Sequence, residues 1–584
     1  MLLEKINGPA DLKKFNASER QELAKEMRAA LLKRASIHGG HFGPDFGMVE
    51  ATIALHTVFD SPHDKFVFDV SHQAYSHKML TGRKQAYLDA AHYDDVSGYT
   101  NPDESEHDFF NIGHTSTSLS LASGLAMARD LKGDKENIVA IIGDGSMSGG
   151  EALEGLDTIG ELNTNLIIVF NDNDMSIAEV HGGMYKGFKE LRDNNGQGSN
   201  NLFKAMGLDY CFVADGNDSE ALIKAFNEVK DIDHPVVVHI VTQKGKGYKF
   251  AEENKEAWHW HLPFDIETGK NKVDYEDMPA EITAKFLLDK MKTDDKLVVM
   301  TAAVPAVMGF TPERRKEAGK QYIDVGIAEE QGVAMASGLA KNGAHPVFAT
   351  YSTFFQRAYD QISQDVCINK NPATFLVFGG SLYSLNDVTH LCLFDIPLLS
   401  NIPNLVYLAP TSYKEYLAML DWSIAQEDYP VAIRVPVLLT KVRDLPVASN
   451  YGEINKYEVT QNGSNVAIIG LGNFYWLAED AAKELAKQGI KATIINPKYI
   501  TGQDKALLNE LKAKHDIVVT LEDGVLDGGF GEKIARFYGN SAMKVLNFGL
   551  AKKFYDRYDP AELAEECHLT APQIANDVMK VLAE

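Results

Sequence analysis

The stretch Ile138-Val-Ala-Ile-Ile-Gly143-Asp144-Gly145-Ser146 decides the fold, because an apolar run leads directly into a small, acidic turn. A second apolar run, residues 166–170, ends in Asn171-Asp172-Asn173. Short runs of this kind are typical of parallel strands buried on both faces. The segment between them, residues 150–162, has a helical pattern, so the whole stretch is predicted to form a βαβ unit.

Asp144 and Asn173 follow these two predicted strands and lie 29 positions apart. Ligands of open parallel sheets bind at the carboxyl ends of the strands. Gly143 and Gly145 would let the backbone approach a phosphate, and the next helix would offer N–H donors. Asp144 and Asn173 supply oxygen ligands suited to Mg²⁺, which would also take two phosphate oxygens. The pattern predicts a diphosphate-and-metal site; the alternative is two polar strand ends that cap ordinary turns.

The bulk composition indicates a soluble multidomain enzyme. At 584 residues the chain is long enough for about three domains. Its net charge of −25 argues against a nucleic-acid partner, since no basic patch would neutralise phosphates. No apolar run approaches the length of a membrane span and the N-terminus does not resemble a signal peptide, so we expect a cytoplasmic protein. Neither disulfides nor zinc are indicated by the spacing of Cys211, Cys367, Cys392 and Cys567.

Strand and helix patterns alternate along nearly the whole chain, which predicts an α/β fold of three doubly wound domains with mostly parallel sheets. The predicted domains are residues 1–270, 280–443 and 450–584, joined by a polar linker at 265–279 and a connection at 443–450. The predicted strands are 66–70, 138–142, 166–171, 236–241, 297–301, 345–349, 374–378, 465–470, 491–495 and 516–520.

Further motifs identify a family. They are Gly39-Gly-His41-Phe, Asp69-Val-Ser-His72-Gln-Ala-Tyr, Gly113-His114-Thr115-Ser-Thr-Ser, Asp324-Val-Gly-Ile-Ala-Glu329 and Tyr351-Ser-Thr-Phe354-Phe-Gln-Arg357-Ala-Tyr-Asp. With them, essentially the whole chain resembles the 1-deoxy-D-xylulose-5-phosphate synthase family of the transketolase superfamily. The resemblance implies thiamine diphosphate (ThDP) and Mg²⁺ as cofactors. It also implies a diphosphate-binding domain, a pyrimidine-binding domain and a transketolase C-terminal domain, in that order.

The resemblance assigns the central acid–base role to Glu329, as the carboxylate that hydrogen-bonds the aminopyrimidine of ThDP. A carboxyl group that shares a proton with a ring nitrogen in a dry pocket needs a raised pKa. The alternative interpretation is a glutamate placed at a helix start, where the helix dipole favours it.

The remaining site residues are also implied by the resemblance. The metal ligands would be Asp144, Asn173 and Met175. The other catalytic residues would be His41, His72, His259 and His390, although any one histidine alone is more often structural. The cofactor contacts would be His72, Gly113, His114, Thr115, Gly145, Ser146, Asn173, Tyr248, Glu329, Phe354 and Arg357.

The implied reaction is decarboxylation of pyruvate and addition of the two-carbon unit to an aldehyde such as D-glyceraldehyde 3-phosphate, in isoprenoid and thiamine biosynthesis. The chain departs from the family pattern at the acceptor end, where Gly379 and Val437 replace arginines and Asn386 replaces an aspartate. Two alternatives therefore stay open: a transketolase-like enzyme with a ketose donor or a different, unphosphorylated acceptor, and a ThDP-binding protein without activity. The family also implies small-molecule substrates and a homodimer with ThDP between the first two domains of one subunit.

Overall fold

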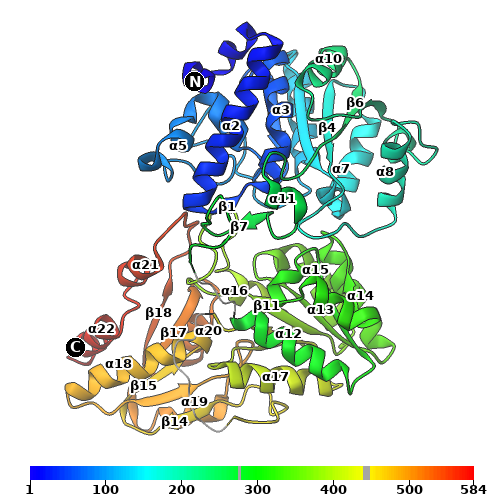
Figure 1. The fold of residues 1–584 in the computed structure, drawn as a ribbon. Helices are drawn as coiled ribbons and strands as arrows, with labels where there is room; N and C mark the ends of the chain where they lie inside the picture. Colours follow the sequence, from blue (N-terminus) through cyan, green and yellow to red (C-terminus); the bar gives the residue numbers. More distant parts are fainter. Residues whose placement is uncertain (274–277, 438–446, 584) are drawn as a thin grey trace. The chain divides into compact units, whose positions relative to one another are not determined.

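A computed structural model describes residues 1–273, 278–437 and 447–583 of the chain. The chain divides into two compact units, Met1–Glu276 with Gly326–Ala328, and Asp277–Val325 with Glu329–Glu584 (Figure 1). Parts of the predicted linker at 265–279 and of the predicted connection at 443–450 lie outside the described residues, and the three domain boundaries stay predictions.

The first unit is built on a five-stranded parallel sheet in the order β2-β3-β4-β6-β5. Gly143 pairs with Asn171, so both predicted ligand-bearing turns leave the sheet at the same edge. The strands are β2 (Lys65–Phe68), β3 (Ile138–Gly143), β4 (Leu166–Asp172), β5 (Asp209–Val213) and β6 (Pro235–Val241), with a small pair β1 (Gly40–His41) and β7 (Trp260–His261) outside the sheet.

Helices cover both faces of this sheet (Figure 1). Val139 and Ile141 pack in the core under α3 and α10, whereas Ile138, Ala140 and Ile142 pack in the core under α6 and α7. This alternation explains why the sequence shows an unbroken apolar run. The helices are α1 (Leu2–Lys5), α2 (Ala17–His38), α3 (Gly43–Val58), α4 (Tyr75–Lys78), α5 (Gln85–Leu88), α6 (Ser118–Lys132), α7 (Gly150–Glu161), α8 (Met184–Asp193), α9 (Leu202–Ala205), α10 (Ser219–Val229) and α11 (Lys249–Glu253).

The second unit contains two sheets. One has six parallel strands in the order β12-β13-β11-β10-β8-β9, and the other has the order β14-β16-β15-β17-β18, in which only β14 is antiparallel. The predicted α/β fold with mostly parallel sheets is confirmed. The strands are β8 (Leu297–Thr301), β9 (Tyr322–Asp324), β10 (His345–Tyr351), β11 (Thr374–Phe378), β12 (Val406–Leu408), β13 (Val431–Arg434), β14 (Glu458–Gln461), β15 (Asn465–Gly470), β16 (Thr493–Asn496), β17 (His515–Val525) and β18 (Lys544–Leu550).

The helices of the second unit pack on both sheets, and α14 begins at Glu329 itself. They are α12 (Met278–Met291), α13 (Pro312–Ala318), α14 (Glu329–Lys341), α15 (Tyr359–Gln361), α16 (Asp395–Leu399), α17 (Tyr413–Ala425), α18 (Tyr475–Lys487), α19 (Lys505–Leu511), α20 (Phe530–Tyr538), α21 (Pro560–Glu566) and α22 (Ala571–Ala583).

A buried ion cluster ties the two sheets of this unit together. Arg434, at the end of β13, donates from Nε to Asp395 Oδ2 at 2.7 Å and from Nη1 to Asp523 Oδ1. Asp523 lies within β17 of the other sheet, and all three side chains are buried. Because these groups are buried away from water, their attraction is strong. Removing one partner would leave an uncompensated buried charge.

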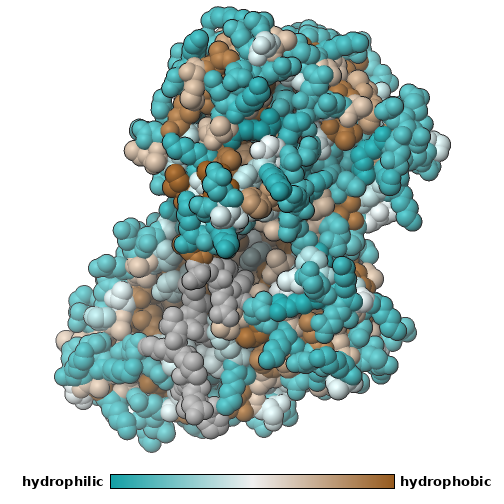
Figure 2. Space-filling view, viewed as in Figure 1, coloured by the Kyte–Doolittle hydropathy of each residue, from teal (hydrophilic) through white to brown (hydrophobic). Residues whose placement is uncertain are grey.

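The visible surface is mostly hydrophilic, with scattered apolar residues (Figure 2). Among the described residues, no helix combines the length and the apolar character that crossing a membrane requires.

Replacing the arginine of this cluster should destabilise the second unit. In Arg434→Met, two buried carboxylates lose their cation, so we expect the free energy of unfolding to fall by about 3–5 kcal/mol. The measurement is urea unfolding followed by circular dichroism. Lys292→Met, which removes an exposed partner of Asp289 within one helical turn, is the control and should change stability by well under about 1 kcal/mol. Equal effects of the two substitutions would contradict the role of the cluster.

Candidate functional site

The three predicted metal ligands lie together at the carboxyl edge of the first sheet. Asp144 is buried, and its Oδ1 accepts a hydrogen bond from Gly145 N at 3.0 Å. Its Oδ2 accepts from Asn173 N at 3.3 Å and from Met175 N at 3.1 Å. The buried Asn173 Oδ1 makes no hydrogen bond to any described residue. An unpaired buried oxygen beside a carboxylate fits a hard cation, because such a cation supplies the missing interaction.

A second carboxylate, Asp172, lies near Asp144 and makes the site more favourable for a cation. Burial and the neighbouring Asp172 raise the pKa of Asp144. Asp172 itself is neutralised, since Arg192 Nη1 donates to it at 2.7 and 2.8 Å and His239 Nε2 lies 3.0 Å from it. Within the part of the chain that the structure describes, no cluster of three His, Cys, Asp or Glu side chains could hold a metal. A metal at Asp144 would therefore need amide, backbone or ligand oxygens as well.

Lys244 is a site residue that the sequence reasoning missed. Its Nζ donates to Ser176 O at 2.6 Å, and its side chain is buried and interacts electrostatically with Asp144. Burial lowers the pKa of Lys244 to about 7. A signal existed in the sequence, because Lys244 comes soon after β6, at the edge of the sheet where ligands bind.

The predicted phosphate loop, Gly113 to Thr115, leads into α6 and is fixed by Asp69. This buried carboxylate accepts hydrogen bonds from Ser116 N at 2.7 Å and Ser118 N at 3.0 Å. Ser116, at a φ of +74°, also donates from Oγ to Ser146 O at 2.8 Å. The loop is thereby joined to the turn that carries Gly145 and Ser146, as expected for one phosphate site.

His72 follows a strained turn. Val70 and Ser71 have φ values of +51° and +61°, which side chains other than glycine rarely adopt. Ser71 holds the turn, since its Oγ donates to Ile112 O at 2.5 Å and accepts from Thr100 N at 2.9 Å. Strain of this kind costs about 1–3 kcal/mol per residue and is typical of functional sites.

Three of the four predicted histidines form a cluster. The rings of His41 and His72 stack at 4.7 Å, and His259 meets them edge-on at 5.4 and 5.0 Å. Burial, and secondarily Lys244, lowers the pKa of His41 to about 4 and that of His259 well below its usual range. Both imidazoles are therefore neutral at pH 7, able to donate or accept a hydrogen bond.

Tyr248, a predicted cofactor contact, is held by a hydrogen bond and by aromatic packing within the first unit. Its hydroxyl donates to Ile266 O at 3.0 Å, and its ring packs with Trp258 and Phe264 at 5.1 and 5.7 Å. Lys244, at the start of the same segment Lys244-Gly-Lys-Gly-Tyr248, interacts electrostatically with Asp144.

The second unit holds the other predicted residues. Glu329 is 3% exposed, and its Oε2 makes no hydrogen bond to a described residue. Burial raises the pKa of Glu329 to about 7, although the nearby Arg357 acts in the opposite direction. Phe354 meets the His390 ring edge-on at 5.8 Å. A buried carboxyl with an unsatisfied oxygen and a pKa near neutrality suits proton sharing with a basic ring nitrogen.

Two of the three positions that depart from the family pattern, Gly379 and Asn386, have structural reasons, and nothing in the structure explains valine at 437. Gly379 has a φ of +75°, and a Cβ there would lie 2.8 Å from Ser384 Oγ, so any side chain would be strained. Asn386 Nδ2 donates to Tyr558 O at 2.8 Å, a bond that an aspartate cannot make. Val437 N donates to Asn473 Oδ1 at 3.3 Å.

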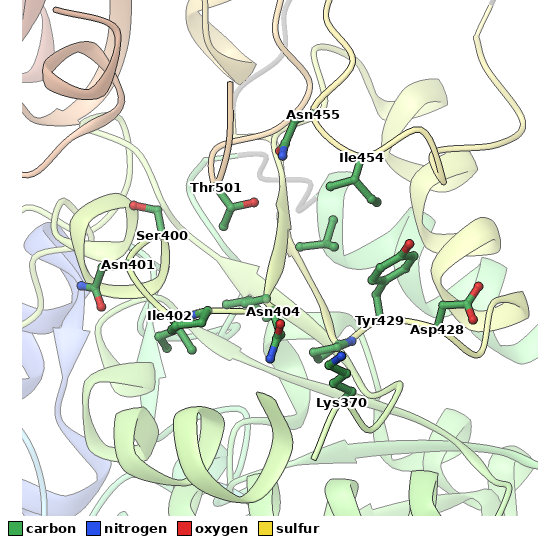
Figure 3. A pocket seen from close by; sticks show the side chains of 14 residues that line it. Lys370, Ser400, Asn401, Ile402, Asn404, Asp428, Tyr429, Ile454, Asn455 and Thr501 are labelled. Carbon is green, nitrogen blue, oxygen red and sulfur yellow. The ribbon is translucent and has the colours of Figure 1, made fainter. Parts of the chain in front are cut away.

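A cavity of about 690 Å³ in the second unit contains none of the predicted site residues (Figure 3). Its lining includes Lys370, Asn404, Tyr429, Asn455 and Thr501. Its charged side chains are Lys370 and Asp428, and the other lining residues are uncharged polar or apolar. One carboxylate and one lysine do not make a metal or diphosphate site.

The raised pKa of Glu329 predicts a pH-dependent stability change. Because its folded-state pKa of about 7 lies above the ordinary value of 4.5, its stabilising contribution is complete below pH 4.5 and is lost as the pH rises through 7. In the absence of ligands, Glu329→Gln should therefore be more stable than the wild type at pH 8, by at most about 3 kcal/mol, and the gain should shrink toward pH 5. Thermal unfolding at several pH values measures it. Glu330→Gln is the matched control, and a gain equal to the control's would contradict the burial argument.

Known proteins match the chain along its length. The family model described as 1-deoxy-D-xylulose-5-phosphate synthase matches residues 3–199 and 194–242, the transketolase pyrimidine-binding domain matches 280–442, and the transketolase C-terminal domain matches 455–574. The solved structure of a transketolase from Campylobacter jejuni is 18% identical, covers 97% of this chain and 100% of its own, and has a TM-score of 0.45.

Curated relatives are much more similar. A 1-deoxy-D-xylulose-5-phosphate synthase from Caldanaerobacter subterraneus is 37% identical over 617 aligned positions, which cover 99% of each chain. A second, from Geobacter metallireducens, is 36% identical and covers 98% of each chain. This chain therefore belongs to the 1-deoxy-D-xylulose-5-phosphate synthase family.

Proposed function

We propose that the chain is a ThDP- and Mg²⁺-dependent 1-deoxy-D-xylulose-5-phosphate synthase, which decarboxylates pyruvate and joins the two-carbon unit to D-glyceraldehyde 3-phosphate. The observation that carries the proposal is Glu329, a buried carboxyl with an unsatisfied oxygen, in a chain that aligns with 99% of a relative bearing the synthase name. The alternative with a ketose donor gains no support from the family relationship, because the relatives at 36–37% identity bear the synthase name.

The first unit would hold the charged end of the cofactor. Asp144, Asn173 and Met175 would bind Mg²⁺, the last through its backbone. Gly145, Ser146 and the loop of Gly113, His114 and Thr115 would meet the diphosphate, where the small glycine and serine residues allow close approach. Lys244, buried beside Asp144, would contribute positive charge to a site that receives phosphates. Tyr248 would support this region through its aromatic packing.

The second unit would hold the aminopyrimidine. Glu329 would share a proton with a ring nitrogen, which its raised pKa allows near pH 7. Phe354 would provide an apolar wall, and Arg357 a positive charge that limits the rise in the Glu329 pKa. When bound, ThDP supplies the carbon nucleophile and the electron sink for the decarboxylation.

The histidines would donate and accept protons around the reacting carbons. His41, His72 and His259 form a cluster in which two imidazoles are neutral, so they can donate hydrogen bonds to a developing negative charge without adding a fixed positive one. His390 would act from the second unit as a donor or acceptor near the acceptor aldehyde.

The assembly and the domain roles belong to the same proposal. We infer a cytoplasmic homodimer with small-molecule substrates. Residues 1–270 would bind the diphosphate, 280–443 the pyrimidine, and 450–584 would form the transketolase C-terminal domain. The matched family-model segments support this division.

The direct test is CO₂ release from pyruvate in the presence of ThDP and Mg²⁺. Release should rise sharply when D-glyceraldehyde 3-phosphate is added, and 1-deoxy-D-xylulose 5-phosphate should appear in equal amount. Release that does not respond to this aldehyde would refute the proposed acceptor. If no CO₂ is released while a ketose phosphate acts as donor, the synthase proposal is wrong.

Substitutions separate cofactor binding from chemistry. Glu329→Gln should lower kcat by about 10²–10⁴-fold, since it removes an acid–base group, while Glu330→Gln should leave kcat nearly unchanged.

Asp144→Asn should instead weaken Mg²⁺-dependent ThDP binding, measured by calorimetry, and chelating the metal in the wild type should do the same. Unchanged ThDP affinity in Asp144→Asn would exclude Asp144 as a metal ligand.

A further inference from the structure

The loop that carries His390 is held from outside by a segment of the C-terminal part of the chain. This loop, residues 382–390, comes after β11 and contains the Asn386 that departs from the family pattern. Residues 556–558 contact it through Asn386 Nδ2 to Tyr558 O (2.8 Å), Arg557 N to Asn386 O (2.7 Å), Val388 N to Asp556 Oδ1 (3.2 Å) and Tyr558 Oη to Leu382 O (3.0 Å). The loop is therefore fixed at its first residue and in its middle.

Inside this loop, a chain of hydrogen bonds connects Asp387 with the imidazole of His390. Thr389 Oγ1 lies 2.7 Å from Asp387 Oδ1 and 2.8 Å from His390 Nδ1. The same Asp387 Oδ1 accepts from Thr389 N at 2.9 Å, and His390 N donates to Asp387 O at 2.9 Å. Each member of the chain is thus also held by its backbone.

The geometry assigns the protons in this chain. Asp387 Oδ1 already accepts the Thr389 amide, so it acts as an acceptor, and the single hydroxyl proton of Thr389 points to it. Thr389 Oγ1 can then only accept from His390, which requires the proton of a neutral imidazole to be on Nδ1. The lone pair of the neutral ring is consequently on Nε2.

The surroundings of the chain support a fixed ring. Phe354 meets the His390 imidazole edge-on, and Cys392 Sγ donates to His390 O at 3.5 Å. The charged groups that face Asp387 are Asp556 and Arg557, which act on it in opposite directions. The two charges partly offset each other at Asp387, so the hydrogen bonds from Thr389 are the contacts that hold this carboxyl group in place.

We infer that Thr389 is a positioning residue for His390: held by Asp387, it fixes the imidazole with Nδ1 protonated and presents Nε2 as the nitrogen that takes up and returns a proton. This inference deepens the proposed function and rests on it only for the role of His390 in catalysis. The tautomer itself follows from contacts within the second unit.

The first experiment measures the tautomer directly, without substrate or cofactor. The protein labelled with ¹⁵N-histidine is observed by NMR at a pH above the His390 transition, and His390→Gln assigns the signal among the 18 histidines. The neutral ring of the wild type should show the Nδ1–H form. Thr389→Val keeps the shape but removes the hydroxyl, so the ring should shift toward the Nε2–H form. Thr389→Ser, which restores the hydroxyl, should restore the wild-type signal.

A wild-type ring in the Nε2–H form, or one unaffected by Thr389→Val, would overturn the inference. So would failure of Thr389→Ser to rescue the signal in a protein that unfolds at the wild-type temperature. Because this readout needs no turnover, it stands even if the CO₂ experiment shows that the proposed reaction is wrong.

The second experiment asks whether the tautomer matters for turnover. In Thr389→Val, kcat should fall by about tenfold or more, with the KM for pyruvate nearly unchanged, and Thr389→Ser should recover most of the loss. The limb of the kcat–pH profile that reports the His390 transition should also move in Thr389→Val and return in Thr389→Ser. A parallel loss in both variants with an unshifted profile would show that Thr389 has only a structural role.

Discussion

The burial of Asp144 at the edge of a parallel sheet is the constraint on which the first unit depends. Two carboxylates, Asp144 and Asp172, lie in the same dry region, where charge repulsion is strong. Arg192 and His239 neutralise one of them. The other accepts hydrogen bonds from backbone N–H groups of the turns around it, and Lys244 acts on it through its charge. Burial and Asp172 outweigh these groups and keep the pKa of Asp144 raised, so a bound cation would further favour the charged form of the carboxyl group.

Most of the fold could be predicted because parallel strands buried on both faces leave unbroken apolar runs, as residues 138–142 show. The strand β5 was missed because its apolar run, Tyr210 to Val213, is only four residues long and only partly buried. The helix α8 was also missed, since its residues 184–193 combine glycine with many charges, although Tyr185, Phe188 and Leu191 are buried on one face. Its Tyr185 hydroxyl donates to Asp144 O at 2.9 Å, so this helix supports the site.

The site could be predicted only where a motif carried it. Asp144, Asn173 and Glu329 stand in recognisable local patterns, whereas Lys244, Asp69 and Thr389 gain their importance from contacts made in the folded chain. Lys244 matters because burial places it beside Asp144, 100 positions earlier in the sequence. Asp69 matters because it accepts two amides from a loop about 47 positions later. The place of Lys244 after a strand could be read from the sequence, but its contact with Asp144, like the contacts of Asp69, arises only on folding.

The departures at the acceptor end have a consequence for how a phosphate could be recognised. Arg434 stands in the same segment as Val437, but its N–H groups already donate to Asp395, Asp523 and the Asp523 carbonyl. Recruiting this guanidinium for a phosphate would leave two buried carboxylates without a cation, which is more unfavourable than a new ion pair is favourable. An arginine at 379 would be strained, because the φ is +75° and a Cβ would lie 2.8 Å from Ser384 Oγ. An acceptor phosphate must therefore be held by groups other than these two positions and Arg434, with backbone N–H donors or side chains elsewhere taking the role that guanidinium groups fill in the family pattern.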